Sequence, residues 1–182
     1  MAPFRASIRN RDYTAVVAIS AQSDAPCFGR WASSTTPFPP SSRPQPLTNM
    51  FRVTREIDFC YGHRLLNYDG KCRFLHGHNG KAVIAIEAST LDERGMVLDF
   101  SDIKRVVSNW IDENLDHRMI LHRDDPARDS LEKLGEPLYL LNVNPTAENI
   151  AKQIFDYAHA QGFPIVECHL WETPRCYATY RG

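Results

Sequence analysis

Residues 71–80, KCRFLHGHNG, bring together side chains that bind metals and transfer protons. In an extended chain, side chains alternate between faces, so His76 and His78 point the same way and can bind one ion. His63, in FCYGHRLL, ends the preceding strand pattern, and a hairpin would bring it close to the returning segment. Three neutral imidazoles with one open tetrahedral position are typical of catalytic zinc, whereas structural zinc usually takes four ligands including thiolates. Two histidines at this spacing are also common in solvated loops, so the pair alone does not decide.

Other candidate side chains have two readings each. Cys72 either completes a structural site with the three histidines or stands beside the metal as a base, and spacing leaves both roles open. Asp116 and His117 end a helix in ENLDHR, where polar residues are usually surface residues favoured by the helix dipole. Glu172, in WETP at a turn, is expected to be solvated. If its carboxylate instead faces a pocket, it could accept two parallel hydrogen bonds from a guanidine-like edge. Cys168, inside a strand, is expected to be a small buried hydrophobe.

Two strand patterns must position these side chains. From residue 51 to residue 59 apolar and polar residues alternate with the period of a half-buried strand. The run KAVIAIEA, bounded by Gly80 and Ser89, predicts a second strand. The connection between them far exceeds an ordinary hairpin loop and carries the candidate residues. Long loops on rigid strands often carry function.

Two helices and two more strands follow. The apolar spacing over residues 103–115 predicts an amphipathic helix with Ser101 or Asp102 as its N-cap. NPTAEN predicts a second helix that begins at Pro145 and Thr146. IVECHLWE and CYATY, around the turn TPR, predict the closing strands. The order strand, strand, helix, helix, strand, strand (ββααββ) predicts an α+β fold: one four-stranded antiparallel sheet with both helices on one face.

Composition limits the class of protein. A chain of 182 residues is long enough for one real core. The net charge of -1 gives no electrostatic reason to expect a nucleic-acid or acidic-membrane partner, so we expect a small-molecule partner. No apolar run approaches the roughly 18 to 20 residues that cross a bilayer. Five cysteines, without paired spacing or a secretory signal, predict reduced thiols in a soluble, cytoplasmic protein.

Residues 1–49 differ from the rest of the chain. They hold seven of the twelve prolines, and only two acidic residues against five arginines. This composition cannot bury a core, so we expect a disordered Pro/Ser-rich extension followed by a domain at residues 50–182. The simplest account is a folded unit that begins at Met50, behind a dispensable leader or a misassigned start. We favour it over an organelle transit peptide, because the amphipathic helix of such peptides is weak here.

Six motifs in order, FCYGHRLL, C-x-x-x-H-G-H-N, GMVLDFSDIK, ENLDHRMIL, NPTAENIA and WETPRCYATY, resemble the family of 6-pyruvoyltetrahydropterin and 6-carboxytetrahydropterin synthases. The resemblance covers residues 50–182 and is specific, because six separated motifs rarely coincide by chance. It implies the tunnelling fold, in which subunits associate through their sheets into an oligomeric barrel with active sites at subunit interfaces. The chain departs from the family pattern with Cys60, Tyr61 and Gly62, where small residues are frequent, and with Gly80, where an aromatic residue is common.

The resemblance also implies a substrate, 7,8-dihydroneopterin triphosphate, and a role for each candidate residue. By this resemblance the metal ligands are His63, His76 and His78, and the catalytic thiol is Cys72. Asp116 and His117 form the relay that assists the thiol. Glu172 anchors the pterin ring, with help from Thr173. The reaction removes a proton from a carbon next to a hydroxyl or carbonyl group and loses triphosphate. Zn2+ as Lewis acid would stabilise enolate-like charge while the thiol takes a proton and the relay returns one. In the bacterial branch the product is 6-carboxytetrahydropterin with acetaldehyde lost, on the route to queuosine and other 7-deazapurines.

The sequence therefore predicts a zinc-dependent lyase, with the carboxy product first and a 6-pyruvoyltetrahydropterin synthase as the alternative. A non-catalytic zinc- or pterin-binding module would keep the three histidines and Glu172 but would not need Cys72 or the pair Asp116 and His117. The joint presence of those residues argues against it. A structural zinc protein, with Cys72 as fourth ligand, would leave no coordination position for water.

Overall fold

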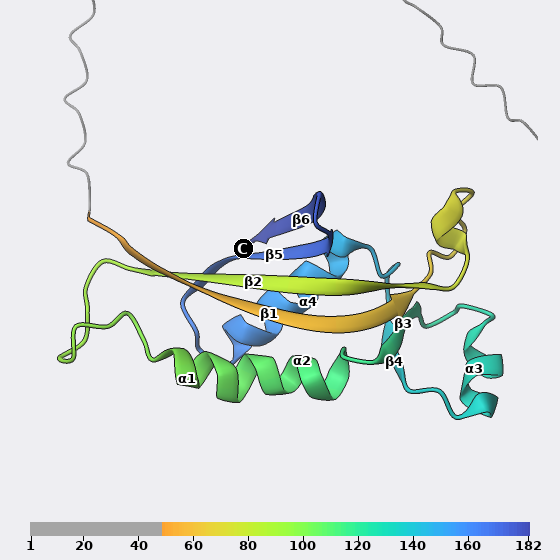
Figure 1. Ribbon diagram of the computed structural model, residues 1–182, viewed down its shortest axis with the longest axis horizontal. Coiled ribbons are helices and arrows are strands. Elements are labelled where there is room, and N and C mark those ends of the chain that lie inside the picture. Colours follow the sequence, from red (N-terminus) through yellow and green to blue (C-terminus); the bar gives the residue numbers. More distant parts are fainter. Residues whose placement is uncertain (1–48) are drawn as a thin grey trace, which may run out of the picture. The chain divides into compact units, whose positions relative to one another are not determined.

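The computed structural model describes residues 49–182 (Figure 1). The extension expected at residues 1–49 lies, apart from its last residue, outside the described part of the chain. Asn49 and Met50 are exposed and lead directly into the first strand. Regular structure in the described residues therefore begins where the alternating apolar pattern begins.

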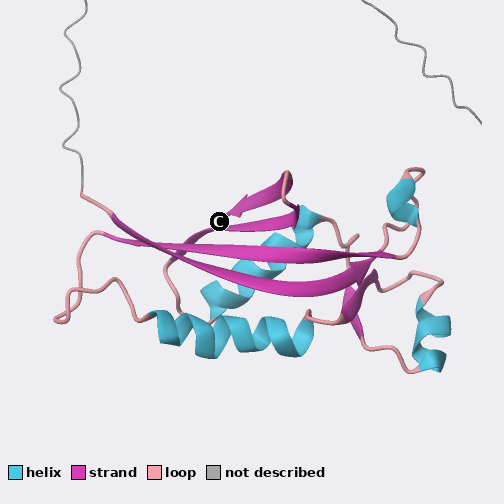
Figure 2. Ribbon diagram, viewed as in Figure 1, coloured by secondary structure: helices cyan, strands magenta, loops and turns pink. Residues whose placement is uncertain are grey.

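The centre of the fold is a six-stranded sheet in the order β4-β3-β1-β2-β5-β6. Strands β1, β2, β5 and β6 pair antiparallel, whereas β3 pairs parallel with β1 and β4 pairs parallel with β3. The two longest strands, β1 and β2, form a 13-residue ribbon that crosses the molecule (Figure 2). The bounds of the strands are β1 Phe51–His63, β2 His76–Ala88, β3 Arg118–His122, β4 Leu138–Leu141, β5 Ile165–Thr173 and β6 Cys176–Arg181.

The prediction of a four-stranded, purely antiparallel sheet is wrong. The four predicted strands are present, but β3 and β4 add a parallel edge and the order of elements is not ββααββ. These two strands have five and four residues, RMILH and LYLL, and most of their residues are apolar or half-buried. Segments this short contain too few residues for an alternating period to be recognised, so their place in the sheet depends on their neighbours.

Residues 49–182 contain three α-helical regions. A continuous helical segment comprises α1 (Phe100–Ile103), a π-helical turn η2 (Lys104–Ser108) and α2 (Asn109–Asn114), as the apolar spacing predicts. Its N-cap is Asp99, whose side chain accepts a hydrogen bond from the N–H of Ser101, so the predicted cap positions are wrong by two or three residues. Helix α4 (Ala147–Ala160) begins after Thr146, as predicted. Helix α3 (Arg128–Leu134) was not predicted.

Both predicted helices cover one face of the sheet, as expected. Their buried side chains form a single core with the inward residues of β1, β2 and β5, which include Ile57, Ile84, Ile111, Ile154 and Leu170. The opposite face of β1 is exposed along its length, with polar side chains such as Glu56 and Asp58. No helix within residues 49–182 is long and apolar enough to cross a membrane. The sheet thus has one buried and one solvated face, a common arrangement for antiparallel strands.

Candidate functional site

The pairing of β1 with β2 brings three candidate metal ligands together. In its register His63 lies opposite His76, and Tyr61 lies opposite His78. Opposed residues of an antiparallel pair project from the same face. His63, His76 and His78, here called the trihistidine group, therefore share the face that carries the core residues. The expectation that a hairpin brings His63 to the returning segment is confirmed.

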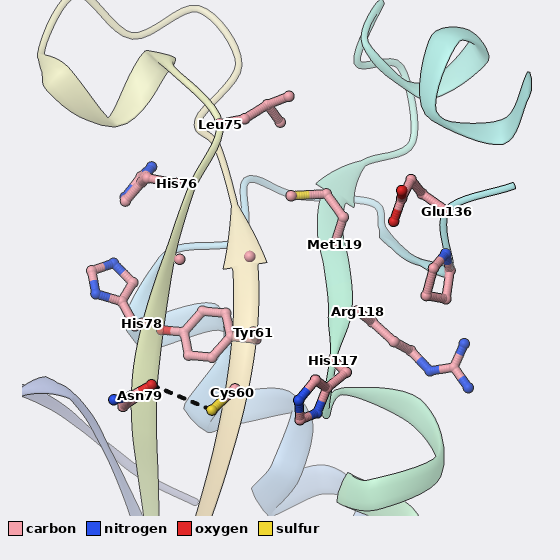
Figure 3. A pocket seen from close by; sticks show the side chains of 13 residues that line it. Cys60, Tyr61, Leu75, His76, His78, Asn79, His117, Arg118, Met119 and Glu136 are labelled. Atoms are coloured by element: carbon pink, nitrogen blue, oxygen red, sulfur yellow. Dashed lines mark hydrogen bonds between the residues drawn. The ribbon is translucent and has the colours of Figure 1, made fainter. Parts of the chain in front are cut away.

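The imidazoles of the trihistidine group converge on one point. Nε2 of His63 lies 3.0 Å from Nε2 of His76 and 3.2 Å from Nε2 of His78. One nitrogen from each residue can be chosen so that all three lie within 4.8 Å of one another. His63 is buried and the other two are half-buried. Figure 3 shows His76 and His78 projecting from the same side of β2.

Backbone carbonyls fix the tautomers of two of these histidines. Nδ1 of His63 lies 2.7 Å from the carbonyl oxygen of Pro145, and Nδ1 of His76 lies 2.8 Å from that of Phe74. A carbonyl oxygen only accepts hydrogen bonds, so both Nδ1 atoms carry the proton and both neutral rings present a lone pair at Nε2. Two lone pairs at this separation repel each other, and a cation between them removes the repulsion. Histidine metal ligands commonly hold their other nitrogen in this way.

Burial favours the neutral form of His63. It lowers the pKa of His63 below the ordinary value of 6.5, and the Pro145 carbonyl opposes this shift only in part. Charge on His76 or His78 would lower the pKa further, while Glu172 acts in the raising direction. Neutral imidazole is the form that binds metal. Three converging imidazole nitrogens are a ligand set that suits Zn2+, so the residues present fit this ion.

Glu172 lies beside the trihistidine group. Its Oε1 atom is 3.8 Å from Nε2 of His63 and accepts a hydrogen bond of 3.2 Å from the hydroxyl of Tyr61. Burial, and then the charge of Glu172, raise the pKa of Tyr61, so the phenol stays protonated as a donor. Glu172 is half-buried within β5 rather than in the turn. Of the two readings of Glu172, the structure supports the one in which the carboxylate faces the site.

The ring of Tyr61 fills space next to Gly80. A Cβ atom at Gly80 would lie 2.8 Å from Cε1 of Tyr61, so a side chain there would displace the ring. Tyr61 is 3% exposed. The two departures from the family pattern noted above are therefore coupled, because a large ring on β1 occupies the room that a side chain on β2 would need. The residue pattern alone assigns no role to Tyr61, although this pair of departures was the available signal.

Thr173 holds the turn that follows Glu172. Its Oγ1 accepts hydrogen bonds from the N–H groups of Arg175 at 3.3 Å and Cys176 at 3.1 Å. The residue is exposed and ends β5. Thr173 is not a member of the trihistidine group, but its two hydrogen bonds fix the end of the strand that carries Glu172.

Cys72 lies in the connection between β1 and β2, within the short 3-10 helix η1 (Lys71–Arg73). It is a half-buried free thiol. The only group of potential metal ligands found among the described residues is the trihistidine group, and Cys72 is not a member. The structure therefore gives no support to the reading of Cys72 as fourth ligand of a structural site. The role of Cys72 as a base beside the metal stays a prediction.

Asp116 and His117 form a pair between α2 and β3. Nδ1 of His117 lies 2.6 Å from Oδ2 of Asp116, whose Oδ1 accepts a 2.7 Å hydrogen bond from the N–H of Cys60. Burial opposes ionisation of Asp116, but the bond from Cys60 and the bond and charge of His117 outweigh it and lower its pKa. His117 has a left-handed backbone (φ 52) and an exposed side chain. The carboxylate thus orients an imidazole that faces outward.

His117, the outward-facing member of the pair, lines an open cavity of about 570 Å³. Its lining includes Cys60, His76, His78, Asn79 and His117. The Cys60 thiol donates a 3.3 Å hydrogen bond to Oδ1 of Asn79 (Figure 3). Asp116 and His117 approach β1 from the β3 side, at Cys60, whereas β2 supplies two of the three histidines. Of the thiols on the described chain, Cys60 rather than Cys72 is the one hydrogen-bonded through its backbone to this pair.

Comparisons with known proteins identify relatives over the described fold. Residues 52–182 match the family model described as 6-pyruvoyl tetrahydropterin synthase. A 6-carboxy-5,6,7,8-tetrahydropterin synthase from Rickettsia felis is 44% identical over 135 residues, which cover 70% of this chain and 98% of the relative. A protein of the same name from Haemophilus influenzae is 34% identical, with 72% and 99% covered.

Solved structures share the fold. An uncharacterized protein from Wolinella succinogenes is 27% identical and superimposes with a TM-score of 0.64. The match covers 74% of this chain and 99% of the other chain. The 6-pyruvoyl tetrahydropterin synthase of Caenorhabditis elegans is 23% identical, with a TM-score of 0.56 and 74% and 96% covered. At that identity the second likeness concerns the fold alone.

Proposed function

Because this chain belongs to the 6-pyruvoyl tetrahydropterin synthase family, we propose that it converts 7,8-dihydroneopterin triphosphate and one water molecule into 6-carboxy-5,6,7,8-tetrahydropterin, acetaldehyde and triphosphate. The names of relatives that are 34% to 44% identical support the carboxy product. The observation that carries the proposal is the convergence of three imidazole nitrogens next to the carboxylate of Glu172. The product would feed the synthesis of queuosine and other 7-deazapurines.

In this proposal His63, His76 and His78 hold Zn2+, and Glu172 holds the pterin. When bound, zinc supplies Lewis acidity toward substrate oxygens and stabilises the negative charge that develops there. The carboxylate of Glu172 accepts two parallel hydrogen bonds from the guanidine-like edge of the pterin. The hydroxyl of Tyr61 keeps that carboxylate in place. Together these groups orient the side chain of the substrate toward the metal.

Proton transfer is assigned to Cys72, Asp116 and His117. Cys72 takes a proton from the carbon next to the oxygen-bearing position, and His117, oriented by Asp116, returns one. In a single chain the pair faces outward beside Cys60 while Cys72 lies in the connection between β1 and β2. We therefore propose that a neighbouring copy in a tunnelling-fold homo-oligomer brings its pair to the thiol. The edge strands β4 and β6, each with one partner in the described chain, support association through the sheet.

The test is incubation of zinc-loaded protein with 7,8-dihydroneopterin triphosphate, with pterins and acetaldehyde followed by chromatography and mass spectrometry. We expect 6-carboxytetrahydropterin and acetaldehyde in equal amounts. The 6-pyruvoyl product would keep the proton chemistry and change the product. Retention of the unreacted pterin by the zinc-loaded protein would instead indicate a binding module.

The Tyr61→Phe variant should bind the pterin less tightly. It removes one hydrogen bond to a charged carboxylate, an interaction worth about 1.5 kcal/mol or more, so KM should rise about tenfold. The kcat value should change less, because Tyr61 does not contact the trihistidine group through its hydroxyl. Steady-state kinetics check this, with Tyr177→Phe, an exposed tyrosine on β6, as the matched control. An unchanged KM would show that Tyr61 does not hold the anchoring carboxylate.

A further inference from the structure

Asn144 clamps two loops that are far apart in the sequence. It follows β4, and its Oδ1 accepts a 2.7 Å hydrogen bond from the N–H of Leu66. Its Nδ2 donates a 2.9 Å hydrogen bond to the carbonyl oxygen of the same residue. Both polar atoms of one side chain thus pair with both backbone groups of one residue, 78 positions earlier in the chain.

Leu66 lies at the base of the loop that carries Cys72. The N–H of the adjacent Leu65 donates a 2.8 Å hydrogen bond to the carbonyl oxygen of Cys72, which closes the base of the loop. Asn67, on the other side of Leu66, has a positive φ of 55. Asparagine is one of the few residues besides glycine that adopt this left-handed conformation, so Asn67 provides a turn directly after Leu66. The position of the thiol therefore depends on how Leu66 is held.

The same residue directly precedes Pro145, whose carbonyl oxygen orients His63. The carbonyl oxygen of Asn144 accepts hydrogen bonds from Nδ2 of Asn149 at 2.9 Å and from the N–H of Thr146 at 2.8 Å. The next residue, Pro145, is fully buried, and its own carbonyl oxygen receives the Nδ1 proton of His63. The side chain of Asn144 thus holds the loop that carries Cys72. Its main chain leads directly into Pro145, which orients His63.

We propose that Asn144 is a positioning residue that sets the place of Cys72 relative to the trihistidine group. It acts through Leu66 and Pro145. The inference rests on the proposed function for its effect on turnover, whereas its effect on the loop stands independently of that function. The pattern NPTAEN indicates a helix start and forms part of a family motif, but it assigns no role to Asn144, because the partner of Asn144 lies in a segment that local spacing does not reveal.

The test compares Asn144→Ala and Asn144→Asp with Asn142→Ala in the full chain. Asn142 is an exposed residue two positions earlier in the same loop. The aspartate variant keeps the size and the acceptor for the Leu66 N–H, but it places a second acceptor against the Leu66 carbonyl. A net hydrogen bond shifts the equilibrium between the closed and the open loop by about a factor of five to ten. Amide exchange at residues 64–74 should therefore become about tenfold faster in both Asn144 variants. Exchange in Asn142→Ala should match the wild type.

Two further readouts separate positioning from general stability. Alkylation of Cys72 by iodoacetamide, followed by peptide mass spectrometry, should accelerate in the Asn144 variants while the urea midpoint of Asn144→Asp stays close to that of the wild type. In the active enzyme kcat should fall about tenfold with little change in KM. Unchanged exchange and alkylation would overturn the inference. If wild-type protein fails to turn over the pterin but the exchange and alkylation results hold, the proposed function fails and the positioning role stands.

Discussion

Replacing His76 by alanine should lower the zinc affinity of the protein about a thousandfold and abolish turnover. The site offers three nitrogen ligands. If a zinc-binding free energy of roughly 12 kcal/mol is shared among three ligands, each contributes about 4 kcal/mol, which is about a factor of one thousand. His76 is half-buried and lies at the end of the hairpin, so its removal disturbs the core less than removal of the buried His63.

The measurement is zinc content after dialysis, followed by competition with a chromophoric chelator and by the pterin assay. His159→Ala is the matched control, because His159 is an exposed histidine on α4 outside the trihistidine group. It should keep about the same zinc content and activity as the wild type. Full zinc occupancy in the His76→Ala protein would mean that the trihistidine group is not the metal site. Loss of zinc with retained turnover would reject zinc dependence.

The Cys72→Ala variant should retain zinc but lose turnover by a factor of about a thousand, the range over which a general base contributes. Retention is expected because the thiol does not belong to the group of potential metal ligands. Cobalt substitution tests the same point, since a thiolate ligand would add a charge-transfer band and the trihistidine group alone would not. If the variant loses both zinc and activity, Cys72 would instead be the fourth ligand of a structural zinc site.

Two controls identify the thiol and its partner. Cys176→Ala, at an exposed position on β6, should be fully active. Cys60→Ala tests the thiol whose backbone contacts Asp116 and His117 within one chain. If Cys60→Ala is inactive and Cys72→Ala is active, the assignment of the base is wrong. Mixing inactive Cys72→Ala with inactive His117→Ala should restore part of the activity if neighbouring copies share sites, and should restore none if each chain acts alone.

Several features of the site could be predicted from local sequence patterns. An alternating strand assigns each residue to a face, so HGHN was sufficient to put His76 and His78 on one side. The order of the predicted elements indicated that both helices would cover the same face of the sheet, which the shared core confirms. Cys168 was expected to be a buried hydrophobe, and it is fully buried, with its pKa raised by burial to about 12.

Other features depended on contacts between distant segments. The parallel edge of β3 and β4 was missed because segments of five and four residues take their strand conformation from their neighbours in the sheet. The direction of Glu172 could not be read from WETP, because it depends on where β5 ends relative to β2 and on the hydroxyl that Tyr61 supplies.

The sequence by itself therefore predicted that His63, His76 and His78 would lie together and that the strands β1 and β2 would support them. Periods of two and 3.6 residues encode the face of an element, and this information is local. Only the tertiary structure decided that the trihistidine group excludes Cys72, that Asp116 and His117 lie beside Cys60, and that Asn144 joins two loops 78 residues apart. Such contacts are set by strand register and by packing between separated segments, so the spacing of residues along the chain does not predict them.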